Sequence, residues 1–137
     1  MNLLQSTTVQ VSIARQPQEV YAYIRDFANF PAWATAFCLG IHNSEDGQWV
    51  METPEGLVSV RFAEANPFGV LDHDVCPVGS DESVWNPMRV LANGDGCEVI
   101  FTLFQRLGMS DEQFAHDAEM VQHDLQSLKR VLENAAQ

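Results

Sequence analysis

The sequence contains one long helical pattern, SDEQFAHDAEMVQHDLQSLKRVLENA, at residues 110–135. Apolar residues recur in it at steps of four, three, four, three and four, which places them on one face of an α-helix. These residues are Phe114, Ala118, Val121, Leu125, Leu128 and Leu132. The opposite face carries His116, Glu119, His123 and Gln126. We therefore expect one long amphipathic helix that covers something apolar along its length.

The start of this helix is well marked. Ser110 is a good N-cap, and Gln113 follows three residues later, which is the pattern of a capping box. Asp111 and Glu112 fall in the first turn, where the helix dipole favours negative charge. The sequence therefore predicts that the helix begins directly after Ser110.

The chain before this helix reads mainly as short strands. A first strand is predicted at residues 7–13, where apolar and polar residues alternate. Pro17 then suits the first turn of a short helix, and Asp26 can cap a second one, interrupted by Pro31, that runs to about Trp33. Six further strands are predicted at residues 39–43, 48–53, 57–64, 70–76, 83–91 and 97–105.

The turns between these strands are short, which favours antiparallel neighbours because parallel crossovers need a dozen or more residues. Pro87 removes a ladder donor, so we expect a bulge or break near Asn86 and Pro87. The resulting prediction is an α+β fold with a curved antiparallel sheet of about seven strands. Two short helices follow the first strand, and the sheet surrounds the long C-terminal helix.

Composition limits the possible functions. With 137 residues, of which 46% are hydrophobic, the chain is expected to form one domain over residues 1–137. The net charge of -12 argues against binding nucleic acid or anionic membrane surfaces. Two explanations of the charge remain: an acidic surface with no binding role, or a surface that binds a basic partner. No apolar run approaches the roughly 20 residues of a membrane span, and no signal peptide is evident. A cytoplasmic location is therefore predicted.

Five short segments carry a resemblance to a known family. They are PQEVY at 17–21, FPAW at 30–33, GVLDH at 69–73, NGDG at 93–96 and FTLF at 101–104. Together with the order of elements, they make the whole chain resemble the SRPBCC superfamily, which includes START-like, Bet v 1-like and polyketide cyclase/dehydrase-like proteins. The resemblance implies a helix-grip fold, with a pocket between the sheet and the long helix.

The resemblance also implies which residues line that pocket. The strands would contribute Trp49, Met51, Val58, Val60, Phe62, Leu71, His73, Trp85, Phe101 and Leu103. Val121 and Leu125 would face them from the helix, and Trp33 and Phe37 would form the mouth.

Polar residues near this pocket leave alternatives open. His73 shares an alternating face with Leu71 and Val75, so it is expected to point inward, either as a core histidine or as a ligand contact or acid-base group. Asp117 and Asp124 border the apolar stripe of the helix, where they are either pocket-rim carboxylates or solvated boundary residues. Arg89 either turns inward to bind a carboxylate or forms an exposed ion pair.

Several kinds of chemistry lack a sequence signal. There is no nucleophile elbow, phosphate loop or dinucleotide fingerprint. The three widely spaced cysteines form no C-x-x-C pair. His116 and His123 lie seven residues apart rather than four, and the adjacent Asp72, His73 and Asp74 would point to opposite faces of a strand. We therefore predict no metal site and no cofactor.

Three hypotheses about function follow. The first is a protein that binds a hydrophobic or aromatic small molecule in the pocket. The second is a polyketide cyclase/dehydrase-like enzyme with His73 as the best catalytic candidate. The third is a protein-interaction domain whose pocket is filled. A homodimer is compatible with each of them.

Overall fold

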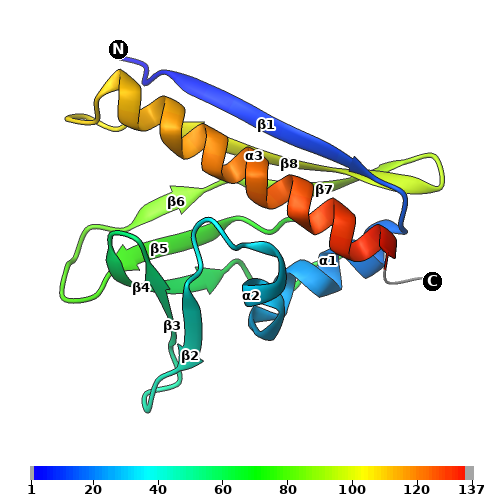
Figure 1. The fold of residues 1–137 in the computed structure, drawn as a ribbon, viewed down its shortest axis with the longest axis horizontal. Helices are drawn as coiled ribbons and strands as arrows, with labels where there is room; N and C mark the ends of the chain where they lie inside the picture. Colours follow the sequence, from blue (N-terminus) through cyan, green and yellow to red (C-terminus); the bar gives the residue numbers. More distant parts are fainter. Residues whose placement is uncertain (1, 135–137) are drawn as a thin grey trace.

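The computed structural model describes residues 2–134 and shows an α+β fold in which strands surround one long helix (Figure 1). The N-terminal part contains β1 (Ser6–Ile13), α1 (Pro17–Arg25), the 3-10 helix η1 (Phe27–Asn29) and α2 (Phe30–Trp33). The strands that follow are β2 (Gly40–Asn43), β3 (Trp49–Thr53), β4 (Gly56–Phe62), β5 (His73–Pro77), β6 (Val84–Asn86), β7 (Met88–Asn93) and β8 (Gly96–Phe104). The last element within the described residues is α3 (Asp111–Asn134). The helix-grip prediction is confirmed.

The strands form two antiparallel sheets, with orders β1-β8-β7 and β2-β3-β4-β5-β6. Residues 2–134 contain eight strands rather than about seven because the predicted strand 83–91 is divided at Pro87 into β6 and β7. The predicted break at Asn86 and Pro87 is therefore confirmed. Because of this break, one stretch of chain supplies β6 to the five-stranded sheet and β7 to the three-stranded sheet, and the strands bend around the helix (Figure 1).

The predicted strand 70–76 begins later than expected, at His73. The residues before His73 pair with β7 instead of β6: Leu71 N–H donates to the Met88 carbonyl at 2.8 Å, and Val90 N–H donates to the Gly69 carbonyl at 2.9 Å. From His73 onward the same chain pairs with β6, with His73 opposite Asn86. The chain thus crosses from the three-stranded sheet to the five-stranded sheet at this point.

The start of α3 agrees with the predicted cap, because Ser110 Oγ accepts a hydrogen bond from Gln113 N–H at 3.0 Å. The Gln113 side chain does not return to Ser110 and instead donates to Asp117 Oδ1 at 2.8 Å. Only half of the predicted capping box is therefore formed. The predicted end of the helix at Ala135 lies outside the described residues.

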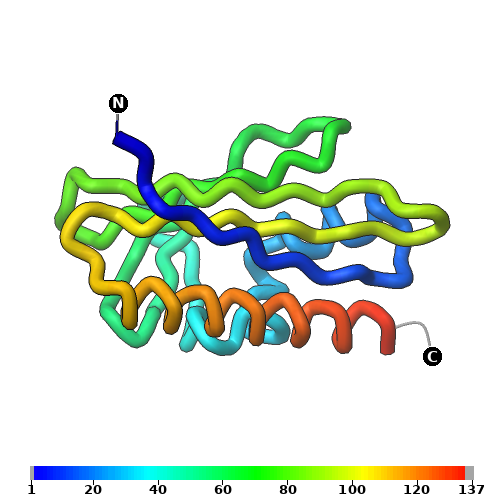
Figure 2. The backbone as a smooth tube through the Cα atoms, turned by 90° about the horizontal axis from the view of Figure 1, so that it is seen from above, coloured from blue at the N-terminus to red at the C-terminus, as the bar shows by residue number. Residues whose placement is uncertain are grey.

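The second half of α3 is attached to β1 (Figure 2). Lys129 Nζ donates to the Ser12 carbonyl at 2.6 Å, and Glu133 Oε2 accepts from Ala14 N–H at 2.9 Å. Leu128 and Leu132 on the same half are buried in the core. The C-terminal half of α3 is thereby fixed against the three-stranded sheet, whereas its N-terminal half borders an open volume.

Candidate functional site

A cavity of about 390 Å³ lies between the helices and the inner side of the strands. Its buried wall consists of Ile24, Phe30, Trp33, Ala34, Met51, Val60, Met88, Leu103, Val121, Asp124 and Leu125. Small-molecule sites in proteins usually measure about 300–1,000 Å³ and combine apolar walls with a few polar groups. The volume and the lining of this cavity agree with that description.

The mouth of the cavity is marked by its exposed lining residues. Pro54 and Glu55 come from the turn between β3 and β4, Arg106 follows β8, and His116 lies in the first half of α3. The resemblance had predicted the mouth at Trp33 and Phe37. For Trp33 this is wrong, because α2 packs against α3 and leaves the indole only 6% exposed.

Most of the predicted pocket residues are brought together around this cavity. From the predicted site, the lining includes Trp33, Phe37, Met51, Val60, Phe62, His73, Phe101, Asp117, Val121 and Asp124. Val58, Leu103 and Leu125 line it as well. Leu71 is instead a fully buried core residue beside Met88.

The predicted inward position of Trp85 is wrong. Its side chain is 52% exposed, while its neighbours Val84 and Asn86 line the cavity. The reason is the register of β6, in which Asn86 lies opposite His73 and Trp85 lies opposite Asp74. Successive strand residues point to opposite faces, so the residue that shares the inner face with His73 is Asn86.

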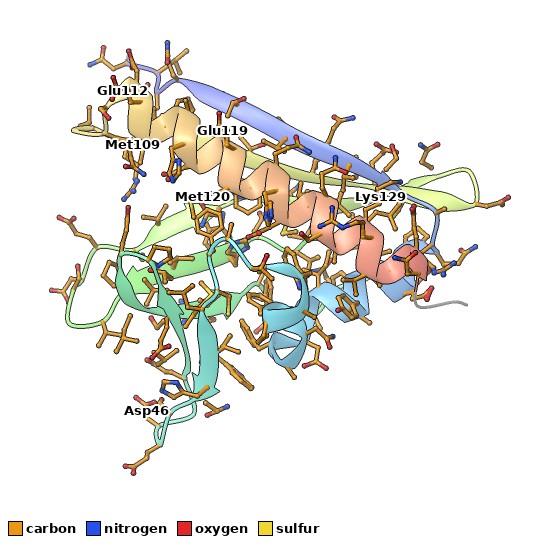
Figure 3. The ribbon with its side chains drawn as sticks, viewed as in Figure 1. Asp46, Met109, Glu112, Glu119, Met120 and Lys129 are labelled. Carbon is orange, nitrogen blue, oxygen red and sulfur yellow. The ribbon has the colours of Figure 1, made fainter. Side chains whose placement is uncertain are left out.

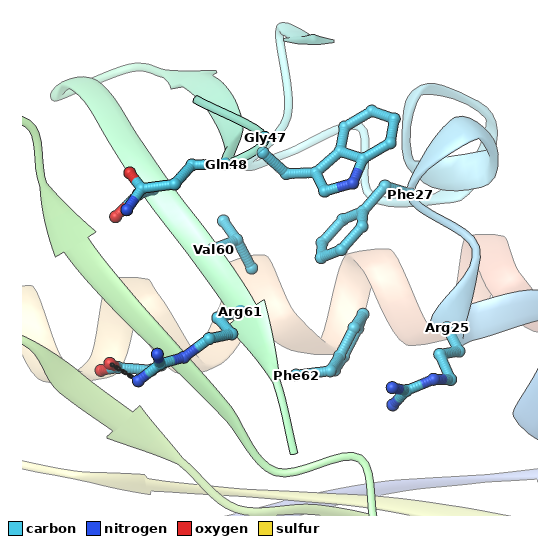
Figure 4. Close-up of a pocket in the computed structure, with 10 residues that line it drawn as sticks. Arg25, Phe27, Gly47, Gln48, Val60, Arg61 and Phe62 are labelled. Carbon is cyan, nitrogen blue, oxygen red and sulfur yellow. Dashed lines mark ion pairs between the residues drawn. The ribbon is translucent and has the colours of Figure 1, made fainter. Parts of the chain in front are cut away.

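Trp49 was also predicted to line this cavity, but it lines a second hollow of about 430 Å³ (Figure 4). It is diverted by Phe27, on which it stacks with ring centroids 5.1 Å apart and an interplanar angle of 24°. Phe27 in turn stacks on Phe62 at 5.1 Å. Val60 and Phe62 line both spaces, so they form the wall that the two hollows share.

The two arginines of the second hollow are both engaged within the protein. Arg25 Nη1 donates to the Ala63 carbonyl at 2.6 Å. Arg61 forms an ion pair with Asp74 at 3.7 Å and is 84% exposed (Figure 4). The arginines of the second hollow are thus already occupied by partners within the protein. The first cavity is the better candidate site, because its polar groups, such as Asp124, are buried among apolar side chains.

His73 is placed in the wall of the main cavity between two aromatic rings. Its ring centroid lies 5.5 Å from that of Phe62 and 5.6 Å from that of Phe101. Its Nδ1 lies 3.0 Å from the Leu71 carbonyl, which can only accept, so Nδ1 carries the proton. Burial lowers the pKa of His73, which keeps the ring neutral and leaves Nε2 as a hydrogen-bond acceptor.

The two helix carboxylates both line the cavity, and neither is fully solvated. Asp117 is half-buried and accepts the Gln113 amide. Asp124 is only 3% exposed, and its Oδ1 accepts from Ala36 N–H at 2.8 Å and lies 3.1 Å from His123 Nδ1. Burial raises the pKa of the Asp124 carboxyl.

Some lining residues were not predicted from the sequence. On α3 they are Gln113, His116 and Met120, of which Met120 is on the cavity side while Glu112 and Glu119 are exposed (Figure 3). A signal for them exists, because Gln113, Asp117, Met120 and Asp124 follow one another at steps of four, three and four. This second stripe runs beside the apolar stripe and faces the cavity.

Within residues 2–134, no three His, Cys, Asp or Glu side chains gather in a way that could hold a metal ion. None of the helices in the described part of the chain is both long and apolar enough to cross a membrane.

Strands that surround one long helix, with an apolar cavity against that helix, define a helix-grip protein. The chain belongs to the family described as polyketide cyclase / dehydrase and lipid transport, whose model matches residues 5–133. A comparison with curated protein sequences found no match.

Solved structures with the same fold have low sequence identity to this chain. The protein XoxI from Bacillus cereus is 16% identical with a TM-score of 0.75, covering 98% of this chain and 99% of its own. A START superfamily protein from Mycobacterium smegmatis is 12% identical with a TM-score of 0.69, covering 95% and 98%. Ara h 8.0201 is 13% identical with a TM-score of 0.70, covering 96% and 99%. These similarities establish the fold alone.

Proposed function

We propose that the protein binds a hydrophobic or aromatic small molecule in the cavity between the strands and α3. The observation that carries this proposal is the open volume of about 390 Å³ beside the helix. Its wall is largely aliphatic and aromatic, so transfer of an apolar ligand from water is favoured by about 25 cal/mol for each Å² buried. His73, Asp117 and Asp124 are the polar groups that would orient the ligand.

The same open volume supports a small-molecule role over an interaction domain with a filled pocket. In a filled pocket, Phe62 and Phe101 would pack directly on α3 and leave no space. Here both side chains line the cavity together with Val121 of the helix. A ligand can occupy that space without displacing the core residues Leu128 and Leu132, which lie further along α3.

The proposal is tested with a neutral apolar fluorophore, N-phenyl-1-naphthylamine, whose emission rises in apolar surroundings. The wild type is expected to bind it saturably. Val121→Phe adds a ring to a buried cavity wall and should weaken binding at least tenfold, because the added volume competes with the ligand. Val131→Phe is the matched control on the same helix, at a half-buried position away from the cavity lining, and should change the affinity less than threefold.

Two results would contradict the proposal: no saturable binding by the folded wild type, or the same loss of binding in both variants. Native mass spectrometry of the freshly purified protein gives an independent measurement. A bound small molecule that is present in the wild type and lost in Val121→Phe would support the cavity as its site.

One observation also favours a second candidate function, a cyclase-like enzyme. His73 is held by the Leu71 carbonyl at one ring nitrogen and has a lowered pKa, which suits a general base rather than an acid. The test is conversion of a linear poly-β-carbonyl compound, followed by mass spectrometry for loss of water on ring closure. Turnover that is unchanged in His73→Gln would remove His73 from such a mechanism.

A further inference from the structure

Asp124 is a buried carboxylate with an unused acceptor. Its side chain is 4% exposed, and Oδ1 takes the hydrogen bond of Ala36 N–H. Oδ2 is buried and has no hydrogen-bond partner of normal geometry, because the Phe37 N–H beside the carboxylate already donates to the Ala34 carbonyl. A buried polar atom without a partner costs about 1–3 kcal/mol, and more when the group is charged. Because Asp124 lines the open cavity, a partner for this acceptor can arrive with a ligand once the carboxylate turns toward it.

A second polar atom in the same wall is also without a partner. Trp33 Nε1 is buried and donates to nothing. In the part of the chain that the structure describes, these are the two buried side-chain nitrogen or oxygen atoms left unpaired, and both residues line the one cavity. The site thus offers a strong acceptor and a weaker, neutral donor.

The charge of the lining selects among ligand head groups. Three carboxylates, Glu55, Asp117 and Asp124, face a single permanent cation, Arg106, which is exposed at the mouth. The nearest positive charge available to Asp124 is His123, whose side chain is 57% exposed and is charged only when protonated. An anionic head group beside Asp124 would meet like charge in a poorly solvated place, which is strongly unfavourable.

We propose that the ligand carries a head group that donates a hydrogen bond, a protonated amine or a hydroxyl, which binds Asp124 Oδ2 while its apolar body fills the cavity. A carboxylate head group is excluded. This inference rests on the proposed function and makes it more specific. Trp33 Nε1 adds a preference for a hydroxyl, because a hydroxyl oxygen can also accept, whereas an ammonium group cannot.

A matched series of naphthalene compounds tests the head group. The probes are 2-(2-naphthyl)ethylamine, 2-(2-naphthyl)ethanol and 2-naphthylacetate, which share the ring and differ at the end of a short chain. The wild type is expected to bind the amine and the alcohol at least tenfold more tightly than the carboxylate, measured by calorimetric titration at neutral pH. This comparison needs no variant, so it holds whatever a substitution does to folding.

Two substitutions assign the preference to residues. Asp124→Asn keeps an oxygen for Ala36 N–H but removes the charge, so the amine should bind at least tenfold more weakly and the carboxylate should no longer be disfavoured. Glu119→Gln, on the exposed face of α3 and outside the cavity lining, is the control and should change each affinity less than threefold. Trp33→Phe should weaken binding of the alcohol more than binding of the amine.

The outcomes separate this inference from the function on which it rests. If the wild type binds all three compounds equally and Asp124→Asn changes none of them, the head-group inference is overturned while apolar binding stands. If none of the three binds, and N-phenyl-1-naphthylamine does not bind either, the proposed function itself fails. Tighter binding of the carboxylate than of the amine would also overturn the inference.

Discussion

At the scale of single residues, Asp72 shows how one side chain repairs a break in a sheet. Strand alternation predicts that Asp72 points away from His73, to the outer face of the strand, yet Asp72 is only 7% exposed. Pro87 has no N–H and interrupts the ladder, and the next donor, Met88 N–H, is buried. Asp72 Oδ1 accepts this N–H at 2.9 Å, and both carboxylate oxygens accept from Arg89 at 2.9 and 2.8 Å. Arg89 thus forms an ion pair rather than a ligand contact.

We expect Asp72→Ala to lower the free energy of unfolding by about 2–3 kcal/mol, because it leaves a buried N–H without an acceptor. Asp74→Ala is the control: it removes the ion pair with the exposed Arg61 and should cost less than about 1 kcal/mol. Urea unfolding at neutral pH measures both. Equal costs in the two variants would show that the Met88 hydrogen bond is unimportant.

The ion pair between Asp72 and Arg89 also makes the stability of the fold depend on pH. The guanidinium of Arg89 holds the pKa of the Asp72 carboxyl below its ordinary value in the folded state. The stabilisation is therefore fully present above the unfolded pKa of about 3.9 and is lost as the pH falls through the lower folded value. The stability difference between the wild type and Asp72→Ala should accordingly shrink below about pH 4.

At the scale of elements, the segment from Gly69 to Asp72 joins the two sheets. Gly69 has φ of +75°, and a Cβ atom added there would fall against the backbone carbonyl of Val90. That carbonyl is close because Val90 N–H donates to the Gly69 carbonyl at 2.9 Å. Neither the φ nor the close approach tolerates another residue, so the crossing of the chain between sheets depends on this glycine.

We expect Gly69→Ala to destabilise the protein by more than about 2 kcal/mol, since it combines a strained φ with a backbone clash. Gly79→Ala provides the comparison, because Gly79 also has a positive φ, +87°, but a Cβ there would meet nothing within 4 Å. Gly79→Ala should lower the free energy of unfolding by about 1 kcal/mol, which is the cost of the strained φ alone. Thermal unfolding of the two variants measures the difference, and equal losses would mean that the contact with Val90 relaxes freely.

The elements also show what the sequence could predict. The long helix follows from its own periodicity and its cap at Ser110, both of which are local. The positions of Trp85 and Asp72 do not, because Pro87 ends one ladder and the pairing partners on either side reset the alternation. The predicted position of Trp49 in the main cavity is wrong for another reason. Its stacking partner, Phe27, comes from a helix distant in the sequence, so the pattern of β3 alone does not indicate it.

At the scale of the whole molecule, the cavity is the feature least visible in the sequence. An apolar residue that fills a core and one that lines a cavity have the same pattern, so Val121 and Leu128 are indistinguishable in the helix stripe. What distinguishes them is the stripe beside it, which is polar at Gln113, Asp117 and Asp124 where the cavity lies. Beyond the cavity this stripe continues at Ser127, which is outside the cavity lining, and on another face of the helix Lys129 donates to the Ser12 carbonyl of β1.

The whole molecule also carries a net charge of -12 from nineteen acidic and seven basic side chains. Few of the acidic residues have a cationic partner, so the folded state experiences mutual repulsion that the expanded chain partly relieves. Salt screens this repulsion, since the Debye length falls from about 30 Å at 0.01 M to about 8 Å at 0.15 M. Stability should therefore rise with ionic strength, opposite to the behaviour of a protein held by surface ion pairs.

We expect the melting temperature to rise by about 3–5 °C between low salt and about 0.3 M NaCl, which corresponds to roughly 1 kcal/mol for a domain of this size. The variant Glu119→Gln removes an exposed charge of α3 outside its first turn and should melt higher at low salt, with a smaller gain from salt (Figure 3). Replacing NaCl with KCl should make no difference if screening is the cause. A melting temperature that stays flat or falls with salt would show that the few ion pairs, such as Arg89 with Asp72, outweigh the repulsion among the acidic side chains.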